Sequence, residues 1–97
     1  MITRVVKMTF KNGNAPVFRE VFNRSKFFIR GFEGCKHLSL LESQTEPNVF
    51  FTYSKWENES YLDLYRNSDL FKSTWAQTKV LFEFPAQAWT CHEEEVA

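Results

Sequence analysis

The chain has 97 residues, in which 12 Lys and Arg balance 12 Asp and Glu, and 18% of the residues are aromatic. This length is typical of one domain, so we expect a single domain over residues 1–97 that buries roughly 60–65% of its unfolded surface. Zero net charge argues against nucleic-acid binding, which usually requires a basic footprint. The sequence shows no apolar signal segment and no run near the ~20 apolar residues of a membrane span, so we expect a soluble, cytoplasmic protein.

Charge is unevenly distributed along the chain. The first 36 residues hold eight basic and two acidic side chains, whereas the remainder holds four and ten. Opposite charges on two halves of a small domain mostly face each other or a symmetry mate, so this split is weak support for a basic binding surface. Cys35 and Cys91 have neither the number nor the spacing of a disulfide framework or a zinc site, and we expect no metal and no cofactor.

The first predicted elements are a strand over Ile2–Phe10 and a helix that ends near Arg30. Apolar and polar residues alternate in the strand, with Arg4 among the exceptions. Asn14 is a suitable cap for the start of the helix. Gly31 is placed to end it in a left-handed conformation.

Two further strands are predicted to form a hairpin. Cys35–Glu42 is the second strand, and the polar run 43–48 connects it to a third strand over Val49–Trp56. In the third strand apolar residues occupy both parities, so neither face is suited to water. This pattern favours a central position in the sheet.

A helical region and a last strand complete the chain. Asn58 is a good N-cap and Glu59 adds favourable negative charge to the first turn. The polar run Asn67–Asp69 interrupts the apolar pattern and can cap a further helical turn. The fourth strand is predicted over Val80–Cys91, with its ladder broken at Pro85.

The order of these elements predicts the fold class. A β-α-β-β-α-β order suits an α+β, ferredoxin-like fold with a four-stranded antiparallel sheet, in which the first and third strands are central and both helices cover one face. The other face also carries apolar residues, because the third strand is aromatic on both sides. Packing two such faces across a two-fold axis gives a homodimer, which we expect here.

A loose residue pattern follows the third strand: Trp56 at its end, Asn58 as a polar cap, Tyr61, and Ser68 followed by Phe71. This pattern resembles the antibiotic biosynthesis monooxygenase family of the dimeric α+β barrel superfamily. The element order and chain length extend the resemblance over nearly the whole sequence. The resemblance therefore implies a dimeric α+β barrel.

Heme-degrading members of that family are similar across the helical region. They carry a tryptophan, a serine three residues later and a heme-ligating histidine ten residues after the tryptophan. These positions fall here on Tyr65, Ser68 and Trp75, so the axial ligand is missing, and the asparagine of their first strand aligns near Val6. The resemblance therefore disfavours heme degradation.

Cofactor-independent members of the family oxygenate electron-rich polycyclic phenols, using the substrate's own carbanion to reduce dioxygen. An amide, the tryptophan of the third strand and a tyrosine just beyond it take part in their pocket. Trp56 matches the tryptophan and Tyr61 lies close to the tyrosine, whereas the amide position falls on Thr52. The resemblance implies a monooxygenase that binds a small aromatic or quinone-like substrate in a cleft between sheet and helices.

Candidate site residues come from the aromatic side chains and one histidine. Core filling explains each aromatic residue alone, but the polar tips of tyrosine and tryptophan need partners, so several together favour a partly polar cavity. His37 is either a half-exposed histidine or a general base that faces the pocket. The predicted catalytic residues are His37, Trp56 and Tyr61, and the predicted substrate-binding residues are Tyr53, Tyr65, Phe71 and Trp75.

Two other functions stay open on the sequence. The first is a non-catalytic ligand-binding or stress-associated homodimer that uses the same cleft without chemistry. The second is a ferredoxin-like nucleic-acid binder, which would need exposed aromatic side chains on a bare sheet face.

Overall fold

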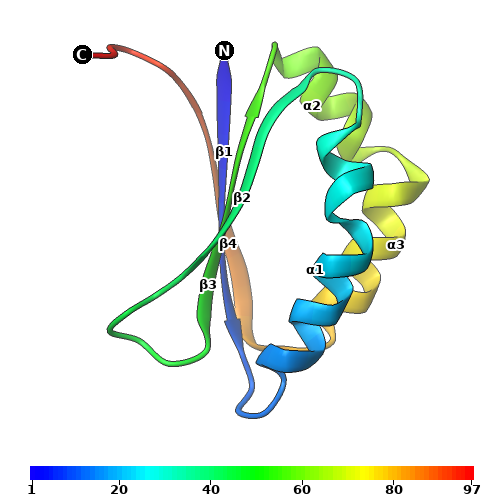
Figure 1. Ribbon diagram of the computed structural model, residues 1–97, viewed down its shortest axis with the longest axis vertical. Coiled ribbons are helices and arrows are strands. Elements are labelled where there is room, and N and C mark those ends of the chain that lie inside the picture. The colour runs from blue at the N-terminus through cyan, green and yellow to red at the C-terminus, as the bar shows by residue number, and fades with distance from the viewer.

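The computed structural model describes residues 1–97 and contains one antiparallel sheet with helices on one of its faces (Figure 1). The strands are β1 (Ile2–Phe10), β2 (Cys35–Glu42), β3 (Val49–Trp56) and β4 (Phe82–His92), in the spatial order β2-β3-β1-β4. The helices are α1 (Ala15–Arg30), α2 (Glu59–Arg66) and α3 (Asp69–Lys79). This confirms the α+β, ferredoxin-like fold with β1 and β3 at the centre. No helix combines the length and the apolar character that crossing a membrane requires.

Side-chain caps start both short helices. The Asn58 side chain accepts a hydrogen bond from the backbone N–H of Tyr61 at 3.2 Å, and Ser68 Oγ accepts from the N–H of Phe71 at 3.1 Å. Each bond satisfies one of the free donors in a first helical turn. The segment predicted as a further turn is a full helix, α3, of 11 residues.

The left-handed turn after α1 lies at Gly34, so the prediction for Gly31 was wrong. Gly31 has φ −83°, and its N–H donates to the carbonyl oxygen of Phe27, which continues the helical conformation. Gly34 has φ +86°, and a Cβ atom there would lie 2.3 Å from atoms of the Tyr61 side chain. Glycine is required at Gly34 both by the backbone conformation and by the close approach of α2.

The junction between α1 and β4 also differs from the prediction. Asn14 precedes α1 as expected, but its side chain makes no cap and donates instead to the carbonyl oxygen of Leu81 at 3.2 Å. This bond holds the start of α1 beside the start of β4. The strand begins at Phe82 instead of Val80, and its register against β1 shifts near Pro85, the residue predicted to break the ladder.

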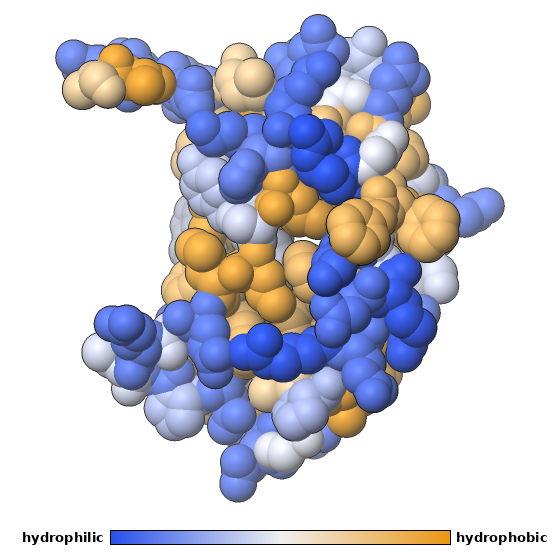
Figure 2. Space-filling model, viewed as in Figure 1, coloured by the Kyte–Doolittle hydropathy of each residue, from blue (hydrophilic) through white to orange (hydrophobic).

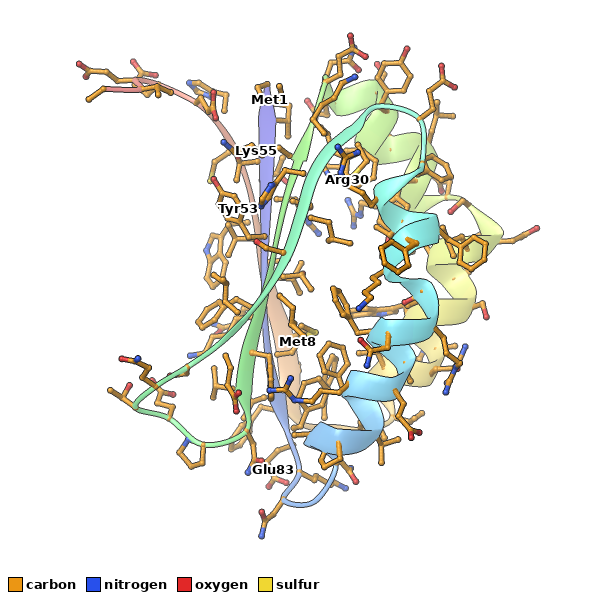
Figure 3. All side chains as sticks on the ribbon, in the orientation of Figure 1. Met1, Met8, Arg30, Tyr53, Lys55 and Glu83 are labelled. Atoms are coloured by element: carbon orange, nitrogen blue, oxygen red, sulfur yellow. The ribbon has the colours of Figure 1, made fainter.

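The buried core lies between the sheet and the helices and has two parts. One contains Met8, Phe10, Phe18 and Phe50, and the other contains Cys35, Trp56 and Leu62. Figure 3 shows Met8 in this layer, whereas Tyr53 lies on the far side of the sheet. No element of the chain covers that far side (Figure 1).

Candidate functional site

A cavity of about 290 Å³ lies between the helix-facing side of the sheet and the three helices. Its floor comes from alternate strand residues, such as Val6 and Met8 of β1 and Thr52 of β3, because successive side chains of a strand point to opposite faces. Figure 2 shows apolar surface gathered in the hollow between sheet and helices. The volume is at the lower end of the roughly 300–1,000 Å³ of small-molecule sites, which suits a ligand of a few fused rings.

Four of the predicted site residues form one side of the cavity as a continuous row of rings. Trp56 stacks on Tyr65 with ring centroids 4.9 Å apart, and Tyr65 meets Phe71 edge-on at 5.3 Å. Phe71 then stacks on Trp75 at 5.9 Å with an interplanar angle of 10°. We call these four residues, all of which line the cavity, the aromatic row. A planar aromatic ligand would find both ring faces and ring edges there.

Trp56 presents its ring to the cavity and keeps its polar atom within the protein. The residue is only 1% exposed, and its Nε1–H donates to Ser54 Oγ at 3.0 Å. Because this hydrogen bond fixes the ring plane and uses the single indole donor, Trp56 acts as a rigid apolar wall.

Tyr65 contributes a hydroxyl group to the aromatic row. Its hydroxyl makes no hydrogen bond within the protein and keeps some solvent-accessible surface, and the residue lines the cavity. Burial raises the pKa of Tyr65 far above its usual range, and the nearby Cys35 thiol acts in the same direction. The phenol therefore remains protonated at neutral pH and can donate a hydrogen bond to a ligand.

His37 and Tyr53 do not line the cavity, because they lie on the opposite face of the sheet. Their rings meet edge-on with centroids 5.6 Å apart, and His37 Nε2 lies 3.2 Å from Ser39 Oγ. Figure 3 shows Tyr53 pointing away from the helices. The structure thus corrects the placement of both residues, and His37 cannot reach a ligand in this cavity as a general base.

Tyr61 packs against the turn before β2 and does not line the cavity. Its ring occupies the space that a side chain at Gly34 would take, next to the core around Cys35 and Trp56. The prediction that placed Tyr61 in the cleft is therefore corrected as well. Tyr65, four residues later on α2, is the tyrosine that lines the cavity.

The two charged residues of the cavity, Arg4 of β1 and Arg66 at the end of α2, were not among the predicted site residues. They are the only charged side chains in the wall, which contains no aspartate, glutamate or histidine. The available clue was that Arg4 interrupts the apolar alternation of β1. Nothing in the local pattern of α2 distinguishes Arg66 from a surface residue.

The wall contains no histidine that could act as the axial ligand of heme iron. Trp75 occupies the position of the heme-ligating histidine of similar proteins and lines the cavity, but an indole N–H is a donor only and cannot coordinate iron. The structure also holds no group of three or more His, Cys, Asp or Glu side chains that could bind a metal ion.

Comparisons with known proteins agree with this architecture. The family model for antibiotic biosynthesis monooxygenase matches residues 1–77. An antibiotic biosynthesis monooxygenase crystal structure superposes with a TM-score of 0.90 at 13% identity, covering 98% of this chain and 100% of that one. A conserved protein from Methanosarcina mazei Go1 has a TM-score of 0.90 at 19% identity over 97% and 94% of the two chains. A variant of SnoaB, a cofactor-independent oxygenase from Streptomyces nogalater, has a TM-score of 0.86 at 17% identity over 98% and 94%.

At these identities the structural matches show a shared fold and no more. A comparison with curated protein sequences finds no match.

Proposed function

Because this chain belongs to the antibiotic biosynthesis monooxygenase family, we propose that it is a monooxygenase that works without a cofactor on a small aromatic or quinone-like substrate in the cavity. The observation that carries the proposal is the aromatic row along an apolar cavity, which suits a planar ring system. The structural similarity to SnoaB, a cofactor-independent oxygenase, supports this class of reaction.

The reaction can be written for an anthrone, which has a methylene carbon between two aromatic rings. Loss of one methylene proton gives a carbanion whose charge is delocalised onto the ring oxygen. Transfer of electrons from this anion to dioxygen and formation of a carbon–oxygen bond convert the methylene carbon to a carbonyl. One atom of dioxygen becomes the carbonyl oxygen, and the other leaves as water with the two methylene hydrogens, so dioxygen takes up four electrons, all from the substrate.

The protein's part in this reaction is to bind, orient and shield the anion. Stacking along the aromatic row fixes the ring plane, and the apolar wall excludes the water that would quench a carbanion. The neutral Tyr65 hydroxyl can donate a hydrogen bond to the ring oxygen on which negative charge develops.

The alternative is a non-catalytic ligand-binding homodimer of the same fold. The observation in its favour is that no carboxylate or imidazole lines the cavity to accept the substrate proton. The two functions differ in turnover, since both require the same aromatic ligand to bind.

We also propose that two copies pack their bare sheet faces together. Tyr53, Val5 and Trp89 are cross-strand neighbours on this face, and Phe51 lies opposite Leu41. Trp89 is 47% exposed and Leu41 49% exposed in the single chain. Covering this surface with a second copy would remove both from water, which is the usual driving force for such an interface.

Oxygen uptake tests the proposed activity. The purified protein is incubated under air with a panel of anthrones and hydroquinones, and quinone formation is followed by absorbance. The expected result is turnover above the uncatalysed rate that is lost in Thr74→Phe, which fills the cavity from α3, and retained in Ala76→Phe, which places the same ring on the exposed side of that helix. Absence of turnover with every member of the panel would favour the non-catalytic alternative.

A further inference from the structure

Arg4 and Arg66 bring two positive charges to an otherwise uncharged cavity. Arg4 lies on the central strand β1 and is partly buried, whereas Arg66 is the last residue of α2 and is exposed to solvent. They belong to different elements, so local sequence does not force them together. Their shared cavity is a product of the tertiary fold.

Neither guanidinium is neutralised by the protein. The three ion pairs of the structure are Arg19 with Glu42, Lys55 with Glu93, and His92 with Glu94, and all lie elsewhere. Arg4 Nη1 donates to Thr90 Oγ1 at 2.7 Å, which satisfies one donor and leaves the charge unpaired.

The two charges act on each other. The pKa of Arg4 is lowered, first by burial and then by the charge of Arg66. An arginine remains protonated even so, because its ordinary pKa is above 12. Two unpaired cations beside apolar walls are unfavourable, and an anion between them would relieve both burial and repulsion.

We infer that the cavity takes a planar aromatic ligand bearing an ionised oxygen group, a carboxylate or a phenolate, which lies against Arg4 and Arg66 while the ring contacts the aromatic row. This inference rests on the proposed function for the aromatic part of the ligand and on the two arginines for its charge. Guanidinium groups suit such a group because their fork of N–H donors matches the geometry of carboxylate oxygens.

The inference also explains how a phenolic substrate could be deprotonated in a cavity that contains no general base. A phenol or enol bound next to two cations ionises more easily, and its pKa should fall by roughly one to three units, as for an acid beside one arginine. The proton can then leave to water before or during binding. Arg4 and Arg66 would act by stabilising the anion, and no protein group has to accept the proton.

Equilibrium binding of a charge-matched ligand pair tests the inference. We would titrate the protein at low ionic strength with 2-naphthoate and with 2-naphthamide, which has the same shape and no charge. The expected result is at least about tenfold tighter binding of the naphthoate, a preference that disappears when Arg4→Gln and Arg66→Gln are combined. Equal affinity for both ligands, a preference that survives the double substitution, or binding of neither ligand would overturn the inference.

Two controls separate charge from folding. Arg4→Lys keeps the positive charge but lacks the guanidinium fork, so it should keep part of the preference, whereas Arg24→Gln removes an arginine of α1 that does not line the cavity and should leave the preference unchanged. A second arm uses 2-naphthol, whose absorbance reports ionisation. A lowered pKa in the bound state assigns the site to phenolates, and an unchanged pKa together with the naphthoate preference assigns it to carboxylates.

These outcomes are independent of turnover. Oxygen uptake by a protein that binds naphthoate and naphthamide equally well would refute the inference about the two arginines and leave the oxygenase proposal intact. A clear preference for naphthoate without oxygen uptake would support the inference about the two arginines and count against the oxygenase proposal.

Discussion

The indole ring of Trp56 stacks on the phenol ring of Tyr65, with centroids 4.9 Å apart and an interplanar angle of 24°. Trp56 ends β3 and Tyr65 lies on α2, so this contact joins the sheet to its helical cover. The pair belongs both to the core around Leu62 and to the cavity wall. The shape of the cavity is therefore coupled to the stability of the fold at this end of the molecule.

The hydrogen bond from Trp56 to Ser54 gives the first prediction. Ser54→Ala leaves the buried Nε1–H without an acceptor, so the free energy of unfolding should fall by about 1–3 kcal/mol in urea titrations. In a Trp56→Phe background, which has no indole donor, the same Ser54→Ala substitution should cost clearly less. An equal cost in both backgrounds would mean that the bond contributes nothing to stability.

The second prediction concerns the close approach of Gly34 and Tyr61. Gly34→Ala must adopt φ +86° and displace the Tyr61 ring, whereas Gly13→Ala must adopt φ +90° with nothing within 4 Å of its new Cβ. We expect a loss of roughly 1–2 kcal/mol for Gly13→Ala from backbone strain alone. Gly34→Ala should lose roughly 1–3 kcal/mol more from the steric clash.

Thermal or urea unfolding of both variants measures the difference. A Tyr61→Ala background serves as the control, because it removes the ring that a methyl group at Gly34 would meet. The extra cost of Gly34→Ala should largely disappear there. Equal losses for the two glycine variants in the original chain would show that the clash is relieved by a small shift of α2.

The fold could be predicted from sequence because its determinants are local. The caps at Asn58 and Ser68 and the alternation within the strands are readable from a few neighbouring residues, and they gave the helix starts and the bounds of β1, β2 and β3. The error at Gly31 has a non-local cause. A glycine after a helix often adopts the left-handed conformation, but here the left-handed residue is Gly34, where the Tyr61 ring of α2 leaves no room for a side chain.

The residue types of the site were easier to predict from the sequence than the direction in which each side chain points. The aromatic row was predicted from residue type and, at Trp56, from the family resemblance, whereas the placement of His37, Tyr53 and Tyr61 depended on which face each element turns to the cavity. A shift of one residue reverses that face in a strand. The convergence of Arg4 and Arg66 depends on tertiary packing and has no sequence pattern of its own.

The third prediction concerns alkaline pH. Burial raises the pKa of both Cys35 and Tyr65, so each stabilises the folded state fully below its unfolded pKa, about 8.5 for cysteine and about 10 for tyrosine. As the pH rises further, the unfolded chain releases these protons first. The free energy of unfolding should fall above about pH 9, with each group adding a slope of up to about 1.4 kcal/mol per pH unit while it is ionised only in the unfolded chain.

Urea titrations at a series of pH values measure this slope. Tyr65→Phe keeps the ring and removes the titrating group, so its stability should fall less steeply than that of the original chain above about pH 10. Cys35→Ala should remove the earlier part of the decline. Parallel curves for the Tyr65→Phe variant and the original chain would refute the assignment to Tyr65.

The last prediction concerns the bare sheet face. Trp89→Glu introduces a charge within the proposed dimer interface, where burial without a partner costs several kcal/mol, so the variant should sediment as a monomer of about half the original mass. Leu64→Glu is the matched control, because Leu64 is 58% exposed on α2 and lies outside that face, and it should leave the assembly unchanged. Circular dichroism verifies that both variants stay folded. If the unsubstituted chain itself sediments at 11.5 kDa at micromolar concentration, the apolar side chains of this face need another explanation.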